Sequence, residues 1–353
     1  MKKLSLFSLI ALVILSCSSS QNKNKNKANS NASVETYAQT ITAAELKDML
    51  YTYASDEFEG RRTGEPGQKK AIDYLKNHYV SNNIPSPIAE GDYFQEIPES
   101  YFNGNIKASE NVLAYIKGSE KPEEIIVISA HLDHIGISKN GDINNGADDD
   151  GSGTVAVLEI AEAFKEAEKA GFGPKRSILF LHVTGEELGL YGSKYYANED
   201  PIFPLANTVV DLNIDMIGRV DPKHEGGENY LYLIGSDKLS TELHNISEEI
   251  NKKYFNLEFD YTYNDDNDPN RFYYRSDHYN FAKNNIPVIF YFNGTHVDYH
   301  RPSDTPDKIN YEFLETRTRL IFTTAWELAN REERIIVDNK DSYKPVHAFG
   351  RRY

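Results

Sequence analysis

The sequence predicts an α/β domain built on a largely parallel sheet. Apolar runs typical of buried strands alternate with patterns of helical periodicity along the chain. The clearest strand is 125–130, and the clearest helix, 155–169, places its apolar residues on one face. Other strands are expected at 95–97, 111–116, 178–183, 209–214, 230–234 and 288–292, and other helices at 43–53, 67–79, 239–254, 276–282 and 311–330. Such alternation is typical of parallel strands, because each helix carries the chain back to the same end of the sheet.

The composition is that of an acidic globular protein. Hydrophobic residues make up 39% of the chain, which is enough for a sizeable core. The 54 acidic residues outnumber the 38 Lys and Arg residues, and the formal net charge is -16. Because a phosphate backbone binds to a basic surface, this charge argues against a nucleic acid as partner.

The first residues resemble a bacterial lipoprotein signal. Lys2 and Lys3 precede an apolar run that ends at Leu15 and is too short to span a bilayer. The run leads to Cys17, the only cysteine of the sequence, in the position of a lipidated residue. We therefore expect an exported protein of the cell envelope, attached to a membrane only through lipid on Cys17. The expected boundaries are 1–16 for the signal peptide, 17–40 for a flexible tether, 41–335 for a single folded domain and 336–353 for a C-terminal tail.

One stretch, His131–Gly153, concentrates side chains of the kind that bind metals. His131 and Asp133 are two residues apart, so they point to the same side of an extended chain. The aspartates 148–150 follow in a glycine-rich turn, where three neighbouring carboxylates repel one another unless a cation is present. Histidine and carboxylate ligands favour zinc or a similar divalent ion. A solvated acidic loop is the alternative for this stretch taken alone.

Residues with side chains that can bind metal ions also follow three other predicted strands. Glu186 and Glu187 come shortly after one strand, and Asp215 ends the next apolar run. His300 lies in the loop after the last predicted strand. Because ligands bind at the carboxyl ends of the strands in open α/β sheets, we expect these residues and His131 to converge at one edge.

Five motifs occur in this order: HLD at 131–133, GADDDGSG at 146–153, GEELGLYGS at 185–193, NIDM at 213–216 and YHRPSDTP at 299–306. Together they resemble the signature set of the two-zinc aminopeptidases, metallopeptidase family 28. The resemblance covers roughly Thr40 to Asn330. It implies a three-layer α/β sandwich with a mostly parallel mixed central sheet, of the zinc-exopeptidase (phosphorylase/hydrolase-like) type.

The resemblance implies two zinc ions as cofactors, with five ligands. Asp149, the middle aspartate, matches the carboxylate that bridges both metals. His131 and Asp215 match the other ligands of one zinc ion, and Glu187 and His300 match those of the second.

The resemblance also implies catalytic roles for two residues that are not ligands. Glu186 matches the general base. Asp133 matches a carboxylate that hydrogen-bonds the ring of His131 and fixes its tautomer. The implied activity is the hydrolysis of N-terminal residues from peptides that have a free amino terminus.

Three alternatives remain open. A glutaminyl cyclase-like acyltransferase would have the same fold with one zinc ion, and a carboxypeptidase would need cationic side chains for a terminal carboxylate. A non-catalytic binding module would lose ligands, whereas this chain keeps all five.

The motif Ser276–His278 resembles one near the substrate pocket of the family, without an assigned chemistry. The residues expected to be structural or to form plain polar turns are His134, His182, His296, Asp265, Asp266 and Asp268.

The lipid anchor can be tested directly. We expect a Cys17→Ser protein to lose its association with membranes, because the variant lacks the cysteine that carries the lipid. More than one lipid chain is needed to hold a protein stably at a membrane. Fractionation of cells into soluble and membrane parts measures this, and full partition of the variant with membranes would show that the anchor lies elsewhere.

Overall fold

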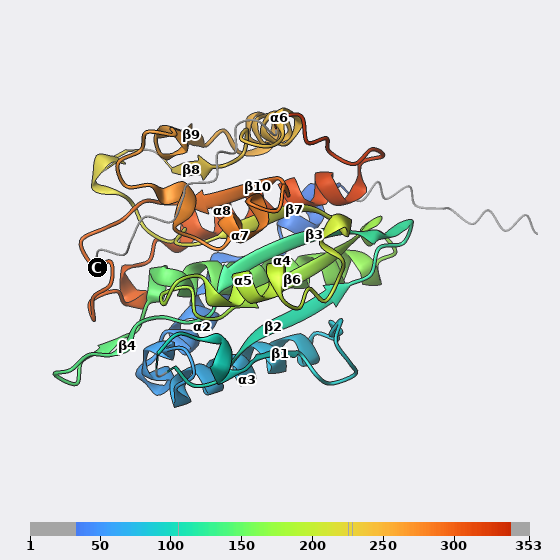
Figure 1. Ribbon diagram of the computed structural model, residues 1–353. Helices are drawn as coiled ribbons and strands as arrows, with labels where there is room; N and C mark the ends of the chain where they lie inside the picture. Colours follow the sequence, from blue (N-terminus) through green and yellow to red (C-terminus); the bar gives the residue numbers. More distant parts are fainter. Residues whose placement is uncertain (1–32, 105, 225, 228, 340–353) are drawn as a thin grey trace, which may run out of the picture. The chain divides into compact units, whose positions relative to one another are not determined.

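The computed structural model describes residues 33–104, 106–224, 226–227 and 229–339. The expectations for 1–32, Cys17 included, lie outside the described residues. An eight-stranded mixed sheet runs through the described part (Figure 1). Its strands are β1 (Phe94–Ile97), β2 (Ser109–Ile116), β3 (Lys121–His131), β6 (Arg176–Val183), β7 (Thr208–Ile214), β8 (Tyr230–Ile234), β9 (Glu258–Asp260) and β10 (Val288–Phe292). Their spatial order is β1-β2-β6-β3-β7-β10-β8-β9, so β1 and β9 form the two edges.

The four strands in the middle of the sheet, β6, β3, β7 and β10, run parallel to one another. They are flanked by β2 and β8, which pair antiparallel with β6 and β10. The strands β6, β7 and β10 are buried along their whole length and β3 from Ile125 onward, as is usual for strands covered on both faces. The predicted α/β class with a mostly parallel mixed sheet is therefore confirmed.

Helices cover both faces of this sheet. They are α1 (Val34–Ala38), α2 (Ala43–Tyr53), α3 (Pro66–Ser81), α4 (Gly153–Lys169), α5 (Tyr191–Asn198), α6 (Thr241–Ile250), α7 (His278–Ala282) and α8 (Tyr311–Asn330). On one face α4 packs against β3, β6 and β7 and against α8, and on the other α7 packs against β7, β10 and α5. The alternation of side chains along β6 agrees with this, because Leu181 clusters with Phe281 of α7, whereas Phe180 stacks with Tyr79 of α3. Within the described residues, no helix combines the length and the apolar character needed to cross a bilayer.

Some local expectations differ from the structure. Ser152 directly precedes α4, and serine commonly caps helices, but its hydroxyl donates to the carbonyl of Asp148 at 2.9 Å and forms no cap. The helix predicted over 239–254 is shorter, because α6 ends at Ile250 and continues as a wider turn. The short helix α1 lies within the segment expected as a tether.

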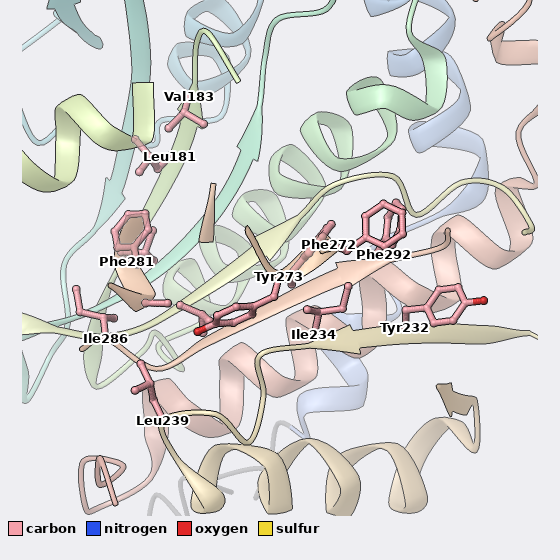
Figure 2. Close-up of a cluster of buried hydrophobic side chains, with 14 of the residues drawn as sticks. Leu181, Val183, Tyr232, Ile234, Leu239, Phe272, Tyr273, Phe281, Ile286 and Phe292 are labelled. Carbon is pink, nitrogen blue, oxygen red and sulfur yellow. The ribbon is translucent and has the colours of Figure 1, made fainter. Parts of the chain in front are cut away.

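A large apolar cluster lies on the face of the sheet that is covered by α5 and α7. Figure 2 shows Leu181 and Val183 of β6 on one side of this cluster and Phe272 and Phe292 farther along it. The last two rings lie 4.9 Å apart between centroids. Burial of each such side chain stabilises the fold by about 1.5–3 kcal/mol. The cluster therefore forms a rigid base beneath the carboxyl end of β10.

The helix α4 carries a buried glutamate, Glu159, which forms no ion pair with any of the described residues. Glu159 is only 3% exposed, although glutamate is rarely buried unless it is paired. Burial, and then the neighbouring carboxylates of Glu162 and Glu45, raise the pKa of Glu159 to about 8. In the folded protein the side chain is thus a neutral acid below that pH.

Glu159→Gln should weaken the pH dependence of stability. The pKa of Glu159 is about 8 in the folded protein and 4.5 in its ordinary state. In the window between these two pH values, Glu159 therefore keeps its proton in the folded state but has lost it in the unfolded chain. The free energy of unfolding therefore falls as the pH rises through the window, by at most ~1.4 kcal/mol per pH unit from this group. Thermal melting should show the variant as more stable than the unmodified protein above the window and equal to it at the acidic end.

The matched control for this prediction is Glu166→Gln, an exposed glutamate on the same helix. Its melting temperature should follow that of the unmodified protein at every pH. If Glu159→Gln and Glu166→Gln gave the same curves, the neutral buried acid would be ruled out.

Candidate metal centre

The predicted metal-type residues come together at the carboxyl ends of the parallel strands. His131 is the last residue of β3, and Asp215 directly follows β7. Glu187 lies in the loop after β6, and His300 lies in the loop after β10. Asp149 lies in the turn that leads into α4. Four parallel strands thus bring together side chains that are far apart in the sequence.

Asp149 lies between two pairs of side chains. Its Oδ1 is 3.2 Å from Nε2 of His131, and that nitrogen is 3.6 Å from Oδ1 of Asp215. Its Oδ2 is 3.1 Å from Nε2 of His300, and that nitrogen is 3.1 Å from Oε2 of Glu187. Each oxygen of Asp149 therefore faces one histidine and one further carboxylate. The structure brings all five predicted ligands together in one cluster.

Asp133 lies beside the ring of His131, but its backbone makes the closer contact. Nδ1 of His131 lies 3.0 Å from the carbonyl oxygen of Asp133 and 3.9 Å from its carboxylate. The carboxylate instead accepts hydrogen bonds from the Thr63 hydroxyl at 2.7 Å and from the Glu186 backbone N–H at 3.2 Å. With Nδ1–H donated to the carbonyl, Nε2 of His131 is left to act as an acceptor or ligand.

Several polar atoms of the cluster are buried without a hydrogen-bond partner. Among the described residues they include Nε2 of His131, both ring nitrogens of His134, Oδ2 of Asp149 and Oε1 of Glu187. Buried polar atoms are normally paired, so a group of unpaired ones at a single place indicates that another species binds there. Imidazole nitrogens and carboxylate oxygens are the ligands that zinc prefers. The residues present therefore fit a zinc site.

The electrostatics of the cluster also favour a cation. Burial lowers the pKa of the His300 ring, but the nearby carboxylates of Asp149 and Glu187 raise that pKa overall, to about 10. Burial opposes protonation of His131 too, yet Asp215 and Asp149 raise its pKa well above the ordinary value. The carboxylates therefore attract positive charge, as protons or as a metal cation.

Asp150 connects the ends of two strands with the start of α4. Its carboxylate accepts the backbone N–H groups of His131 at 3.1 Å, Gly153 at 2.9 Å and Met216 at 3.1 Å. It also lies within 4.8 Å of the ligand atoms of His131 and Asp215. Because these three hydrogen bonds occupy its oxygens, we assign Asp150 to holding the backbone rather than to a metal. The aspartate turn is buried, so the alternative of a solvated acidic loop is wrong.

Asp148 and Asp304 fix the other side of the same turn. Asp148 accepts the Gly218 N–H at 2.7 Å and lies 3.1 Å from Nε2 of His296. Asp304 accepts the N–H groups of Asp148 and Asp149 at 3.0 and 3.2 Å. Burial lowers the pKa of His296, but the contact with Asp148 raises it overall. His296 is thus structural, as the sequence predicts.

A buried arginine connects the beginning and the end of the segment between β3 and the aspartate turn. Arg61 is fully buried and donates to the carbonyls of Leu132 at 3.2 Å, Asn145 at 2.7 Å and Gly146 at 2.8 Å. It also donates to the carbonyl of Tyr53 at 3.2 Å, and its guanidinium lies 4.6 Å from the centroid of that ring. No local pattern of the sequence predicts this role, because the carbonyls of Leu132 and Gly146 are 71 and 85 residues away from Arg61 in the chain.

Asp215 is oriented by a chain of buried side chains. The Ser276 hydroxyl donates to Oδ2 of Asp215 at 2.6 Å, and the Asn213 amide donates to Ser276 at 2.8 Å. Ser129 donates in turn to Asn213 at 2.9 Å. These bonds leave Oδ1 of Asp215 facing His131, and partners of this kind orient metal ligands. Ser276, to which the sequence assigns no chemistry, thus contacts a predicted ligand.

Glu186 lies where two cavities meet. It lines both of them, whereas Glu187 lines only one. No hydrogen bond or ion pair of the Glu186 carboxylate is found within the described residues. Burial raises the pKa of Glu186, His131 lowers it and Glu187 raises it, and the net shift is well upward. A carboxylate that is free of partners and has a raised pKa is suited to proton transfer.

The cavity on the Asp215 side has an aromatic wall. It is lined by Phe272, Phe290 and Phe292 of the apolar cluster. Arg275 packs over the ring of Phe272 at 4.7 Å and lines both cavities, together with Tyr299. The site thus combines an acidic cluster with an apolar recess beside it.

Other residues that the sequence predicts as structural lie apart from the cluster. His182 is buried, its Nε2 lies 2.7 Å from the Tyr79 hydroxyl, and burial lowers its pKa to about 3. Asp268 accepts the backbone N–H groups of Asn270 and Phe272, both at 3.0 Å, as in an ordinary polar turn. His134, in contrast, lies inside the cluster.

Comparison with known proteins supports the same reading of the motifs. The leupeptin-inactivating enzyme 1 of Streptomyces exfoliatus is 32% identical over 173 residues, which are 49% of this chain and 35% of that protein. The leucine aminopeptidase 2 of Trichophyton rubrum is 28% identical over 237 residues, which are 60% of this chain and 43% of that protein. The chain thus spans less than half of the length of either relative.

Solved structures share the fold. The LapA aminopeptidase of Legionella pneumophila has a TM-score of 0.65 at 22% identity, with 85% of this chain and 75% of that chain covered. An aminopeptidase from an Aneurinibacillus strain has a TM-score of 0.62 at 16% identity, with 87% and 98% covered. The predicted zinc-exopeptidase type of α/β sandwich is therefore confirmed.

The sequence profile of Peptidase family M28 matches residues 111–325, which are more than half of the chain. The matched segment runs from β2 into α8 and contains every predicted ligand. The chain belongs to peptidase family M28.

Proposed function

We propose that this protein is a zinc aminopeptidase with a dinuclear metal centre. His131, Asp149 and Asp215 would hold one zinc ion, and Asp149, Glu187 and His300 would hold the second. The observation that carries the proposal is the position of Asp149, whose two oxygens face the two pairs at 3.1–3.2 Å. The family membership and the names of the aminopeptidase relatives support the same activity.

Zinc ions held by these residues would polarise the scissile carbonyl and lower the pKa of the attacking water. The residues of the chain supply the proton transfer. Glu186 takes the proton of the water on its free carboxylate and then delivers it to the nitrogen of the leaving amine. Glu187, the adjacent residue, serves as a ligand, because its oxygens face His134 and His300 instead of the cavity with the aromatic wall.

The substrate is a peptide with a free N-terminal amine. The carboxylates of Asp149, Glu186 and Asp215 line one cavity and attract the positive charge of such an amine. The aromatic wall of the same cavity suits an apolar side chain on the first residue. These features favour removal of single apolar residues from the amino terminus.

The proposal includes export and anchoring to a membrane. Support for both comes from the sequence alone, from the lipoprotein-like segment that ends at Cys17. A peptidase held in the cell envelope would act on peptides outside the cytoplasm.

Removal of metal should lower the stability of the fold. Buried carboxylates that face one another lose their compensating charge when the cation leaves. A ligand that binds only the folded state stabilises it by about 2.7 kcal/mol at a concentration 100-fold above Kd. Thermal melting should therefore shift down on chelation and recover when zinc is added back. An unchanged melting curve in protein shown to be free of metal would contradict this.

Glu186→Ala and Glu187→Ala should separate catalysis from metal binding. Loss of a general base costs about 10²–10⁴ in rate, so Glu186→Ala should lose most turnover while it keeps its zinc. Glu187→Ala should lose zinc as well as activity, because it removes a ligand. Metal analysis and kcat on amino-acid anilides measure both effects.

The need for a free amine provides the control for the same proposal. An N-acetylated peptide should be a poor substrate, because acetylation removes the charge that the carboxylates attract. Near-normal turnover by Glu186→Ala, or equal cleavage of free and acetylated peptides, would show that the mechanism is wrong.

A further inference from the structure

We propose that His134 is an additional protein ligand of the metal position on the Glu187 side of Asp149. The inference rests on the proposed function, because it assumes that metal binds to the cluster. Neither the family resemblance nor the sequence assigns His134 a role at this position.

The position of His134 points to a role inside the cluster. It lies three residues after His131, just beyond the carboxyl end of β3, and is 1% exposed. Its ring lies 5.8 Å from the ring of His300, at an interplanar angle of 68°. Two imidazoles that belong to different loops thus each face one oxygen of Glu187. Nitrogen from both can reach a cation there.

The distances around His134 match those around a predicted ligand. Its Nδ1 lies 2.8 Å from Oε1 of Glu187 and 3.7 Å from Oδ2 of Asp149. The corresponding distances of Nε2 of His131 are 3.2 Å to Asp149 and 3.6 Å to Asp215. Ligand atoms of His134, Asp149 and Glu187 all lie within 4.8 Å of one another. Each histidine therefore stands between Asp149 and one further carboxylate.

The direction of the ring nitrogen favours a metal over a hydrogen bond. Nδ1 of His134 has no hydrogen-bond partner, although the Glu187 oxygen is only 2.8 Å away. A hydrogen bond requires the direction of the N–H as well as the distance. Nε2 of His131 shows the same combination, 3.2 Å from Asp149 and without a partner. Atoms that share a cation lie close together without being aimed at one another.

The backbone of the aspartate turn keeps the His134 ring in place. Gly146 has a φ of +54°, and a Cβ at this position would lie 2.5 Å from Cγ of His134. Only glycine allows the turn to pass so close behind the ring. Any larger residue at this position would clash with the His134 ring.

A fourth protein ligand would make the two metal positions unequal. With His134, the position on the Glu187 side has four protein side chains, which is typical of closed zinc sites. The position on the Asp215 side keeps three and remains open to substrate. We therefore expect the closed position to hold its zinc more tightly.

The test is the zinc affinity of the His134→Asn protein, measured by titration in competition with a chromophoric chelator. The Asn amide can take the place of Nδ1 as a hydrogen-bond donor to Glu187, but it is a poor zinc ligand. If His134 is a ligand, the tighter of the two zinc affinities should fall at least ~10–100-fold, the loss seen even for residues that act on a ligand from outside. The weaker affinity should stay within about threefold of the unmodified protein.

The matched control is His182→Asn, which changes another buried histidine, hydrogen-bonded to Tyr79. Both of its zinc affinities should equal those of the unmodified protein, and the melting of the metal-free forms should show that each variant is folded. His134→Ala serves as a second variant and should match His134→Asn. If His134→Asn kept both affinities while His134→Ala lost one, His134 would be a hydrogen-bond donor only, and the inference would be overturned. An unmodified protein that binds fewer than two zinc ions would overturn the proposed function instead.

Discussion

Mutual repulsion among buried carboxylates is the constraint on which this structure depends. Asp149, Glu187 and Asp215 converge at one end of the sheet, and each is almost completely shielded from water. Negative charges at such short distances and in such a place are costly unless cations lie among them. The histidines around Asp149 supply part of this compensation, and a bound metal cation would supply the rest. We therefore expect folding and metal binding to be coupled in this protein.

The rest of the architecture serves to hold these groups at fixed positions. Four parallel strands bring the ligands to one edge, and the backbone between them is tied by side chains that are not ligands. Asp150 joins the ends of β3 and β7, and Arg61 joins both segments of the loop after β3. Ser276 sets the orientation of Asp215. His131 and Asp215 thus each have a contact outside the ligand set that orients the side chain, as is usual for metal ligands.

The sequence predicts the fold class and the composition of the site well, for physical reasons. Buried parallel strands appear in the sequence as apolar runs. The residue after each run lies at the carboxyl end of a strand, where ligands bind in sheets of this kind. His131, Glu187 and Asp215 could be placed in one cluster on this ground alone. The assignment of Asp149, rather than its neighbours, as the bridge came from the family resemblance, and the distances in the structure agree with it.

Other features depend on contacts that no local pattern reveals. Ser152 resembles a helix cap, but its hydroxyl bonds to Asp148 because the tight aspartate turn brings that carbonyl within reach. Arg61 acts on backbone carbonyls more than 70 residues away in the chain. His134 enters the cluster because the turn at Gly146 packs behind its ring. Such roles are determined by tertiary packing, which the sequence shows only as residue types without partners.

The zinc content of the intact protein tests the central claim most directly. The metal-free protein should be titrated with zinc, and the bound metal should be counted per chain by elemental analysis after removal of the excess. A dinuclear centre around Asp149 predicts that two zinc ions bind per chain. It also predicts that the affinity for both ions falls markedly when Asp149 is replaced by asparagine. One zinc ion per chain, as in a mononuclear acyltransferase of the same fold, or no zinc at all, would contradict the account.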